Sequence, residues 1–221
     1  MCYAIGLGLQ DTSHFSGIDT KRDRRMKVLG IYGSPRKGGN SDQLLDKALK
    51  GAHSCGAETR SVYPRDLNMC GCLECGGCDK TGRCVVKDDM QSIYPLLQEA
   101  DVVILASPIF FYNVTAQAKA LIDRSQAMWS KRMLEKDRDQ RKRYDSGKGY
   151  LIAVAASKGQ RLFDCAGLTA RYFFDAMDMS YEGGLFFRGL ESKTDLKKRP
   201  DMLEQAFKLG RNAVQRGEKN P

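Results

Sequence analysis

The amino-acid sequence predicts an α/β domain with a doubly wound parallel sheet, and two observations support this prediction. Short, continuously apolar segments recur along the chain, most clearly at Asp101–Ser107 (DVVILAS) and Tyr150–Ala156 (YLIAVAA). Such runs are typical of strands that are covered on both faces, as in parallel sheets. Between them lie segments with the spacing of amphipathic helices, and strands that alternate with helices indicate βαβ units. The length of 221 residues suits one domain with a single core.

The first half of the chain begins with the short apolar run Lys27–Gly33, which we predict to be a buried strand. A stripe of leucine and alanine at helical spacing follows, and Ser41 is a natural N-cap for that helix. Glu58–Tyr63 is a weaker second strand. A cysteine-rich loop at residues 70–84 then precedes a helix at Asp88–Ala100.

The second half continues the same alternation. We predict helices at Thr115–Trp129, Arg161–Met177 and Pro200–Arg216, and a last strand at Tyr181–Arg188. The expected organisation is therefore one domain at residues 26–216, an irregular extension at 1–25 and a tail at 217–221. Met26 stands directly before the first strand, so a translation start there instead of at Met1 is a hypothesis.

The formal net charge of +9 is typical both of nucleic-acid binders and of enzymes for anionic cofactors. Much of the excess lies in Lys131–Lys148, which we interpret as a solvated helix end and loop. Only Tyr144 interleaves with the basic residues, so no stacking surface for nucleic acid is evident. The chain has neither an apolar run near the roughly 20 residues of a membrane span nor the apolar core of a secretion signal. We expect a cytoplasmic protein that binds neither nucleic acid nor membrane.

The loop after the first strand has the composition of an anion-binding site. Its sequence, GSPRKGGNS at Gly33–Ser41, supplies glycines for close approach and leads into a helix N-terminus, where free N–H groups favour an anion. A Walker A loop would end in Gly-Lys-Ser/Thr and a dinucleotide loop would read GxGxxG, and neither pattern is present. An ordinary glycine-rich turn is the remaining alternative. The candidate phosphate-binding residues are Ser34, Arg36, Lys37, Gly39, Asn40 and Ser41.

The loop after the strongest strand holds three consecutive aromatic residues in the sequence SPIFFYN. We expect at least one of them to cap the sheet and the others to form a wall for a flat ring, such as an isoalloxazine. The candidate ring-binding residues are Ser107, Pro108, Ile109, Phe110, Phe111 and Asn113. A third loop, SKGQR, adds the candidates Ser157 and Gly159. Its glycine allows close approach and Lys158 or Arg161 offers positive charge near the ring, although a solvated turn fits the loop equally well.

Five of the eight cysteines fall within residues 70–84. From Cys72 the spacing is C-x2-C-x2-C-x5-C, through Cys75, Cys78 and Cys84. Thiols alone, with no histidine nearby, favour an iron–sulfur cluster over zinc. Structural zinc more often uses two CxxC pairs that are separated by a longer loop. Zinc, free thiols and a site without metal remain alternatives, and Cys70 is a spare thiol or an alternative ligand.

Together these motifs resemble the NAD(P)H-dependent FMN reductase-like and iron–sulfur flavoprotein family. The resemblance covers Met26 to Arg216 and is carried by GSPRKGGNS, by the cysteine motif followed by VVKDDM, and by SPIFFYNVTAQAKALIDR. It implies a flavodoxin-like five-stranded sheet of order 2-1-3-4-5 with helices on both faces, and homodimers or homotetramers with the flavin near a subunit interface. By position, it assigns the FMN phosphate to Ser34, Arg36, Asn40 and Ser41, the ring to Pro108, Phe110 and Asn113, and a [4Fe-4S] cluster to Cys72, Cys75, Cys78 and Cys84. The family often has tyrosine at the position of Phe110.

The sequence thus predicts an FMN-dependent oxidoreductase. Electrons would pass from NAD(P)H or a ferredoxin-like donor to a flavin, quinone or other small-molecule acceptor, with the cluster as a one-electron relay. The two histidines, His14 and His53, lie outside the predicted site, which fits chemistry performed by the cofactor. One alternative is a non-enzymatic electron-transfer or redox-sensing flavoprotein. Another is a zinc-stabilised binder of nucleotides or nucleic acid.

Overall fold

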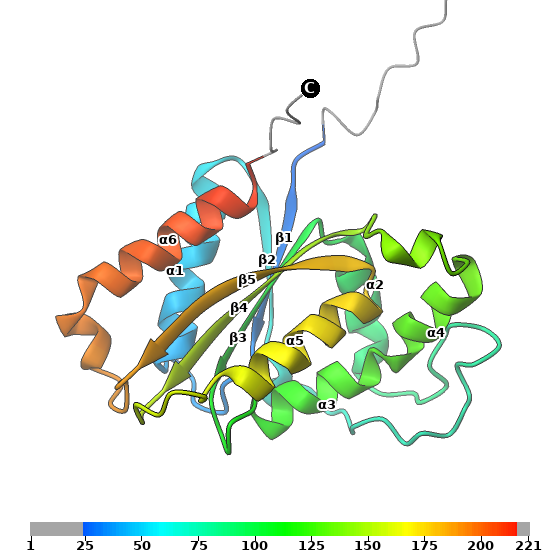
Figure 1. Cartoon of the computed structure of the whole chain (residues 1–221), viewed down its shortest axis with the longest axis horizontal. Coiled ribbons are helices and arrows are strands. Elements are labelled where there is room, and N and C mark those ends of the chain that lie inside the picture. Colours follow the sequence, from blue (N-terminus) through cyan, green and yellow to red (C-terminus); the bar gives the residue numbers. More distant parts are fainter. Residues whose placement is uncertain (1–23, 216–221) are drawn as a thin grey trace, which may run out of the picture.

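Five parallel strands form a single sheet of order β2-β1-β3-β4-β5 in the computed structural model, which describes residues 24–215 (Figure 1). The strands are β1 Lys27–Tyr32, β2 Glu58–Val62, β3 Val102–Pro108, β4 Gly147–Ala155 and β5 Met179–Arg188. This order confirms the predicted flavodoxin-like fold. The predicted tail at 217–221 and residues 1–23 of the extension predicted at 1–25 lie outside the described residues, so the choice between Met1 and Met26 stays a hypothesis. The domain limits of 26–216 stay a prediction.

Helices cover both faces of the sheet (Figure 1). The helices α1 Asn40–Ser54 and α6 Pro200–Ala213 pack on one face, while α2 Met90–Glu99, α3 Ala116–Arg124, α4 Gln126–Glu135 and α5 Asp164–Ala176 pack on the other. Single-turn 3-10 helices lie at Pro64–Asp66 (η1), Gln140–Lys142 (η2) and Asp195–Lys198 (η3).

The central strand β3 shows why its sequence is apolar without alternation. Val103 and Leu105 belong to the core beneath α2 to α5, whereas Val102, Ile104 and Ala106 belong to the core beneath α1 and α6. Successive side chains of a strand point to opposite faces, so a strand covered on both sides buries every residue.

The two helices on the α1 side approach each other to backbone contact. A methyl group built on Gly51 of α1 would lie 2.0 Å from the carbonyl oxygen of Phe207 in α6. One built on Gly210 of α6 would lie 1.8 Å from the carbonyl oxygen of Ala48 in α1. The absence of a side chain at both glycines is therefore what permits this crossing.

Two local predictions about helix ends are wrong. The N-cap of α1 is Gly39 and not Ser41, because the chain already turns at Gly38, whose φ is +69°, and Ser41 is buried inside the first turn. The single helix predicted at Thr115–Trp129 is divided at Ser125, whose Oγ donates to the carbonyl oxygen of Ile122 at 2.7 Å. A serine that bonds the backbone in this way competes with regular helical hydrogen bonds.

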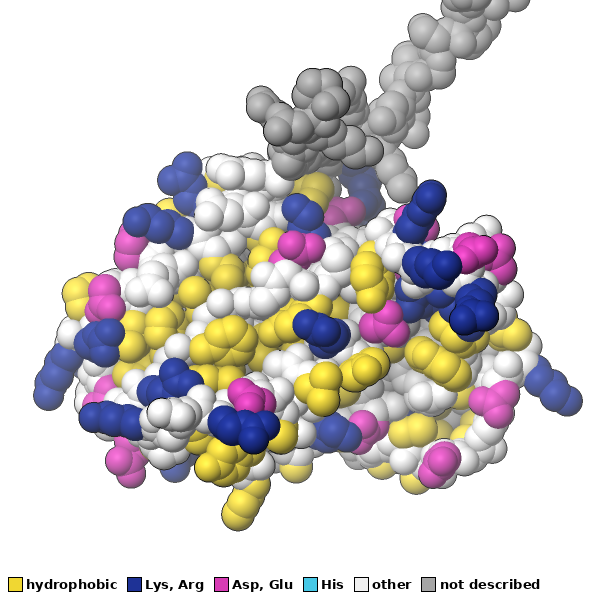
Figure 2. All heavy atoms as spheres, in the orientation of Figure 1, with side chains coloured by type: hydrophobic (Ala, Val, Ile, Leu, Met, Phe, Trp, Pro, Cys, Tyr) yellow, Lys and Arg dark blue, Asp and Glu magenta, His cyan; other side chains and the backbone are white. Residues whose placement is uncertain are grey.

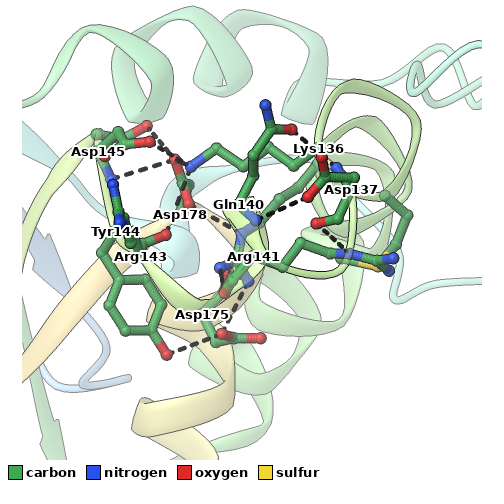
Figure 3. Close-up of polar contacts among 12 residues, drawn as sticks. Lys136, Asp137, Gln140, Arg141, Arg143, Tyr144, Asp145, Asp175 and Asp178 are labelled. Atoms are coloured by element: carbon green, nitrogen blue, oxygen red, sulfur yellow. Dashed lines mark hydrogen bonds and ion pairs between the residues drawn. The ribbon is translucent and has the colours of Figure 1, made fainter.

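The basic segment Lys131–Lys148 is only partly the solvated stretch that the sequence predicts. Arg132 is 5% exposed, and its guanidinium donates to Asp178 at 2.9 Å and to Asp175 at 2.8 Å. Lys136 also donates to Asp178, at 2.5 Å, and Figure 3 shows its side chain directed at that carboxylate. These ion pairs fasten α4 and the following turn to the end of α5.

The surface of the face drawn in Figure 2 shows lysine and arginine interspersed with aspartate and glutamate. The positive charge is therefore not gathered into one patch on that face. Within residues 24–215, no helix combines the length and the apolar character that crossing a membrane requires.

Candidate functional site

A cavity of about 270 Å³ opens at the carboxyl end of the sheet, where ligands bind in open α/β folds. It is lined by Ser34, Pro35, Arg36, Gly39, Asn40, Ser41, Pro108, Ile109, Phe110, Val154, Ala156, Leu190, Glu191 and Lys193. The loops after β1 and β3 thus meet in one place. Among the predicted site residues, Lys37, Ser107, Phe111, Asn113, Ser157 and Gly159 are not part of this lining.

The loop after β1 is held in shape by its own backbone and by its neighbours. Gly33 donates to the carbonyl oxygen of Ala106 in β3 at 2.7 Å, and the amide of Arg36 donates to Ser34 Oγ at 3.1 Å. The first backbone hydrogen bond of α1 runs from Gln43 to Gly39. The amides of the first helical turn therefore have no partner within the helix and are available to an anion.

The loop after β3 is a two-residue hairpin. Phe110 and Asn113 exchange backbone hydrogen bonds of 2.8 and 3.0 Å, and the two residues between them, Phe111 and Tyr112, have φ angles of 47° and 65°. Positive φ at both central positions is the geometry of a type I′ turn, which aromatic residues rarely adopt.

The three aromatic residues of this hairpin all lie at the surface. Phe110 is 49%, Phe111 103% and Tyr112 52% exposed, so the expectation that one of them caps the sheet is wrong. Hydrophobic side chains protrude at the lower edge of the molecule, below the loop that joins β3 to α3 (Figures 1 and 2).

Two predicted residues of this loop have contacts within the protein. Ser107 is fully buried, and its Oγ accepts a hydrogen bond from the amide of Thr115 at 3.2 Å. Asn113 Oδ1 accepts from the amide of Val114 at 2.8 Å. Thr115 also donates through its hydroxyl to the carbonyl oxygen of Gly33, which joins the loops after β1 and β3.

The segment after β5 forms a wall of the cavity that the sequence did not predict. Asn40 Nδ2 donates to the carbonyl oxygen of Ser192 at 2.9 Å, and Lys193 Nζ donates to the carbonyl oxygen of Lys37 at 3.2 Å. The third predicted loop lies beside it, because Arg188 donates to the carbonyl oxygen of Gly159 at 3.0 Å. Residues about 150 positions apart are in contact here, and no local sequence pattern predicts such a contact.

A second cavity, of about 620 Å³, is lined by the four predicted metal-ligating cysteines, Cys72, Cys75, Cys78 and Cys84. All seven cysteines in the described part of the chain are free thiols. Among residues 24–215, however, no three histidine, cysteine or carboxylate side chains are close enough together to form a metal site. The donor chemistry of four thiols suits an iron–sulfur cluster, but this geometry does not gather them into a ligand set.

Arg124 of α3 lines this second cavity and is 1% exposed. It makes two hydrogen bonds to Asp88, of 2.5 and 3.0 Å, and others to the Cys70 carbonyl oxygen at 3.2 Å and to Cys84 Sγ at 3.4 Å. It therefore joins both ends of the cysteine loop to α3. No motif in the sequence points to a role for this arginine. The signal for its burial in the sequence is its position one helical turn after Leu121, because residues at this spacing lie on the same face of a helix.

The charge of Arg124 changes the acidity of its neighbours. Its hydrogen bond holds the pKa of the Asp88 carboxyl below the ordinary value of 3.8. Burial alone would raise the pKa of the Cys84 thiol. Hydrogen bonds from Val86 and Tyr94, together with the Arg124 charge, outweigh burial and lower it. The cysteine cavity thus contains at least one thiol that is biased toward the thiolate, the form that binds metals.

Comparison with known proteins adds relatives of two kinds. Residues 26–178 match the family model described as NADPH-dependent FMN reductase. An iron–sulfur flavoprotein of Archaeoglobus fulgidus is 48% identical over 99 residues, which are 45% of this chain and 45% of that protein. An iron–sulfur flavoprotein of Methanosarcina thermophila is 43% identical over 100 residues, 45% of this chain and 52% of the relative. The chain thus spans about half the length of the curated relatives that it matches.

Among solved structures, the NAD(P)H:quinone oxidoreductase from Methanothermobacter marburgensis superposes with a TM-score of 0.66. The alignment covers 88% of this chain and 100% of that one, at 16% sequence identity. At this identity the likeness shows the fold alone. Because the family model matches well over half of the sequence, the chain belongs to the NADPH-dependent FMN reductase family.

Proposed function

We propose that the protein is an FMN-dependent oxidoreductase that takes electrons from NAD(P)H and passes them to a small-molecule acceptor such as a flavin or a quinone. The observation that carries this proposal is the cavity at the carboxyl end of the sheet. One part of its wall is the glycine-rich loop and the N-terminus of α1, and another is the apolar loop after β3. A phosphorylated flavin needs this pairing, because it has a dianion at one end and a flat ring at the other.

The residues of this cavity fit FMN in their chemistry. The first-turn amides of α1, with Ser34, Ser41 and Arg36, are donors for the phosphate. Asn40 Oδ1 is buried without a hydrogen-bond partner, so it is an acceptor for a hydroxyl group such as the ribityl chain carries. Pro108, Ile109 and Phe110 would lie along the ring, and Val154 and Ala156 supply further apolar wall.

Bound FMN supplies the hydride and electron chemistry, and the protein positions it. The lining of the cavity contains no histidine, and Glu191 is its one carboxylate. Arg36 and Lys193 place positive charge around the cavity, which favours anionic ligands such as a phosphate. The side chains would therefore bind and orient the cofactor and neutralise the charge of its phosphate, while the cofactor performs the redox step.

The proposal includes a [4Fe-4S] cluster held by Cys72, Cys75, Cys78 and Cys84, which would supply one-electron transfer when bound. Two observations support it: the four thiols line one cavity, and the similar proteins from Archaeoglobus fulgidus and Methanosarcina thermophila are named iron–sulfur flavoproteins. The cysteine loop would have to draw its thiols together around the cluster. We further propose a homodimer or homotetramer, and a ferredoxin-like protein as the alternative electron donor.

Anaerobic stopped-flow mixing of the FMN-loaded protein with NADPH tests the function. We expect rapid bleaching of the yellow flavin absorbance, followed by its return when a quinone is added. Flavin that binds but does not bleach over minutes would contradict the reductase and favour an electron carrier. Iron and zinc analysis of the anaerobically purified protein tests the metal. A colourless protein with stoichiometric zinc would contradict both the cluster and the flavin.

A further inference from the structure

Arg65 lies beneath the glycine-rich loop and outside the cavity that the loop lines. It belongs to η1, directly after β2, and its side chain is 9% exposed. One guanidinium nitrogen, Nη1, donates to the carbonyl oxygen of Ser34 at 2.9 Å and to Asp42 Oδ2 at 3.0 Å. The guanidinium also lies 4.9 Å from the centre of the Tyr63 ring, which stacks on Tyr32. Its position is thus fixed by the loop, by α1 and by an aromatic pair.

Asp42, the partner of Arg65, is a carboxylate in the first turn of α1. Its side chain is 5% exposed, and its Oδ2 also accepts the amide of Gly38 at 3.0 Å. Burial raises the pKa of this carboxyl, and the Gly38 amide and Arg65 oppose that effect. Asp42 Oδ1 and Arg65 Nε are both buried without a hydrogen-bond partner, and less than a tenth of either side chain is exposed.

The carboxylate of Asp42 has two opposing effects on the proposed phosphate site. The carboxylate of Asp42 shapes the loop by binding the Gly38 amide, but its negative charge would repel a phosphate dianion bound at the same helix terminus. Arg65 removes that conflict, because it neutralises the carboxylate at close range and also binds the Ser34 carbonyl oxygen, which is itself a negative dipole end.

We propose that Arg65 is a positioning residue for phosphate recognition, which cancels the charge of Asp42 and thereby lets the loop select phosphorylated flavin over riboflavin. The proposal rests on the proposed function, in which this loop holds the FMN phosphate. It assigns the selectivity to a residue that does not touch the ligand.

The test compares FMN with riboflavin, which lacks the phosphate, by fluorescence titration of the full-length protein. For Arg65→Met we expect FMN affinity to fall about tenfold, as for the loss of one charge-assisted interaction, and riboflavin affinity to change less than about twofold. Arg65→Lys, which keeps the charge, should bind FMN with an intermediate affinity. Arg60→Met is the matched control, because it removes the same charge from β2 at a side chain that is 51% exposed.

A double variant separates charge cancellation from a merely structural role. In Arg65→Met/Asp42→Asn the unpaired carboxylate is gone, while the asparagine oxygen still accepts the Gly38 amide. We expect FMN affinity to recover to within about threefold of the wild type, as replacing a whole buried ion pair is often close to neutral. A double variant that binds FMN as weakly as Arg65→Met overturns the proposal.

The remaining outcomes distinguish the inference from the function on which it rests. A wild-type protein that binds FMN and riboflavin equally contradicts the phosphate site itself. A wild type that prefers FMN, with Arg65→Met keeping the same preference, overturns only the role of Arg65. Equal loss of both ligands also overturns it. Circular dichroism verifies folding, and if Arg65→Met does not fold, Arg65→Lys and the double variant carry the comparison.

Discussion

Replacing Gly210 with alanine is expected to destabilise the protein, because the substitution inserts a methyl group where α6 touches α1. The new Cβ would lie 1.8 Å from the carbonyl oxygen of Ala48 and 2.6 Å from its carbonyl carbon. An ordinary contact begins at 3.4 Å, so the atoms must separate by about 1.6 Å. Backbone atoms on both helices make the contact, and no side chain can rotate away to relieve it.

The expected magnitude combines two opposing effects. Overpacking of a well-packed contact costs about 1–3 kcal/mol, and a clash between backbones belongs at the upper end of that range or beyond. Alanine is better than glycine in a helix by about 1 kcal/mol, which offsets part of the cost. We therefore expect Gly210→Ala to lower the free energy of unfolding by about 2 kcal/mol, a decrease of roughly 4–8 °C in Tm for a protein of this size.

Urea unfolding followed by circular dichroism measures this effect, with Gly167→Ala as the matched control. Gly167 lies inside α5, and a methyl group placed on it would have the Tyr181 hydroxyl, at 3.9 Å, as its nearest neighbour. The control should therefore gain about 0.5–1 kcal/mol of stability from helix propensity alone. A Gly210→Ala protein that is as stable as the wild type, beside a stabilised Gly167→Ala, would refute the backbone contact between α1 and α6.

Three further predictions concern the two cavities. Asn40→Ala should weaken FMN binding by about 1–3 kcal/mol in a fluorescence titration, because it removes a polar group of the cavity and its hydrogen bond to Ser192; unchanged affinity would argue that Asn40 does not contact the bound FMN. Cys75→Ser should remove iron and the brown absorbance shoulder while the yellow flavin remains, and a surviving shoulder would contradict the cluster assignment. The pKa of Asp88 is lowered by its hydrogen bond from Arg124, so this pair stabilises the folded state above the ordinary carboxyl pKa of 3.8 and the contribution is lost as pH falls below it. Asp88→Asn should therefore lower the unfolding free energy at pH 7 by about 2 kcal/mol, and the difference from the wild type should shrink in urea titrations toward pH 3; a difference independent of pH would contradict the ion pair.

The sequence predicts the sheet well because its signals are local. The apolar run at Asp101–Ser107 becomes β3, with alternate residues buried on opposite faces, and the loops that follow β1 and β3 meet at one cavity. Once the strands are known to be parallel, their carboxyl ends must lie at one edge, so loop composition alone brings candidate residues together.

The features that the sequence did not predict depend on contacts between residues distant along the chain, or on side chains that compete with the backbone for hydrogen bonds. The break at Ser125 follows from one side-chain hydrogen bond to the backbone, which helical periodicity does not reveal. The exposure of Phe111 follows from a two-residue turn, whose length is visible only once the backbone bridge between Phe110 and Asn113 is known. The burial of Arg124 reverses the usual expectation for an arginine, and its hydrogen bonds to Asp88 and to the cysteine loop, both distant along the chain, explain it.

The bond between Asn40 and Ser192 joins residues 152 positions apart, and this has a consequence for biosynthesis. A ribosome makes the segment that walls the cavity only about 150 residues after the glycine-rich loop. Until β5 has paired with β4, the loop lacks that wall, so the nascent chain has the motif without the pocket. Long-range closure of this kind comes late in folding, since distant ends must first be brought together. Ligand binding in this cavity therefore requires that the chain has been synthesised and folded at least as far as the segment after β5.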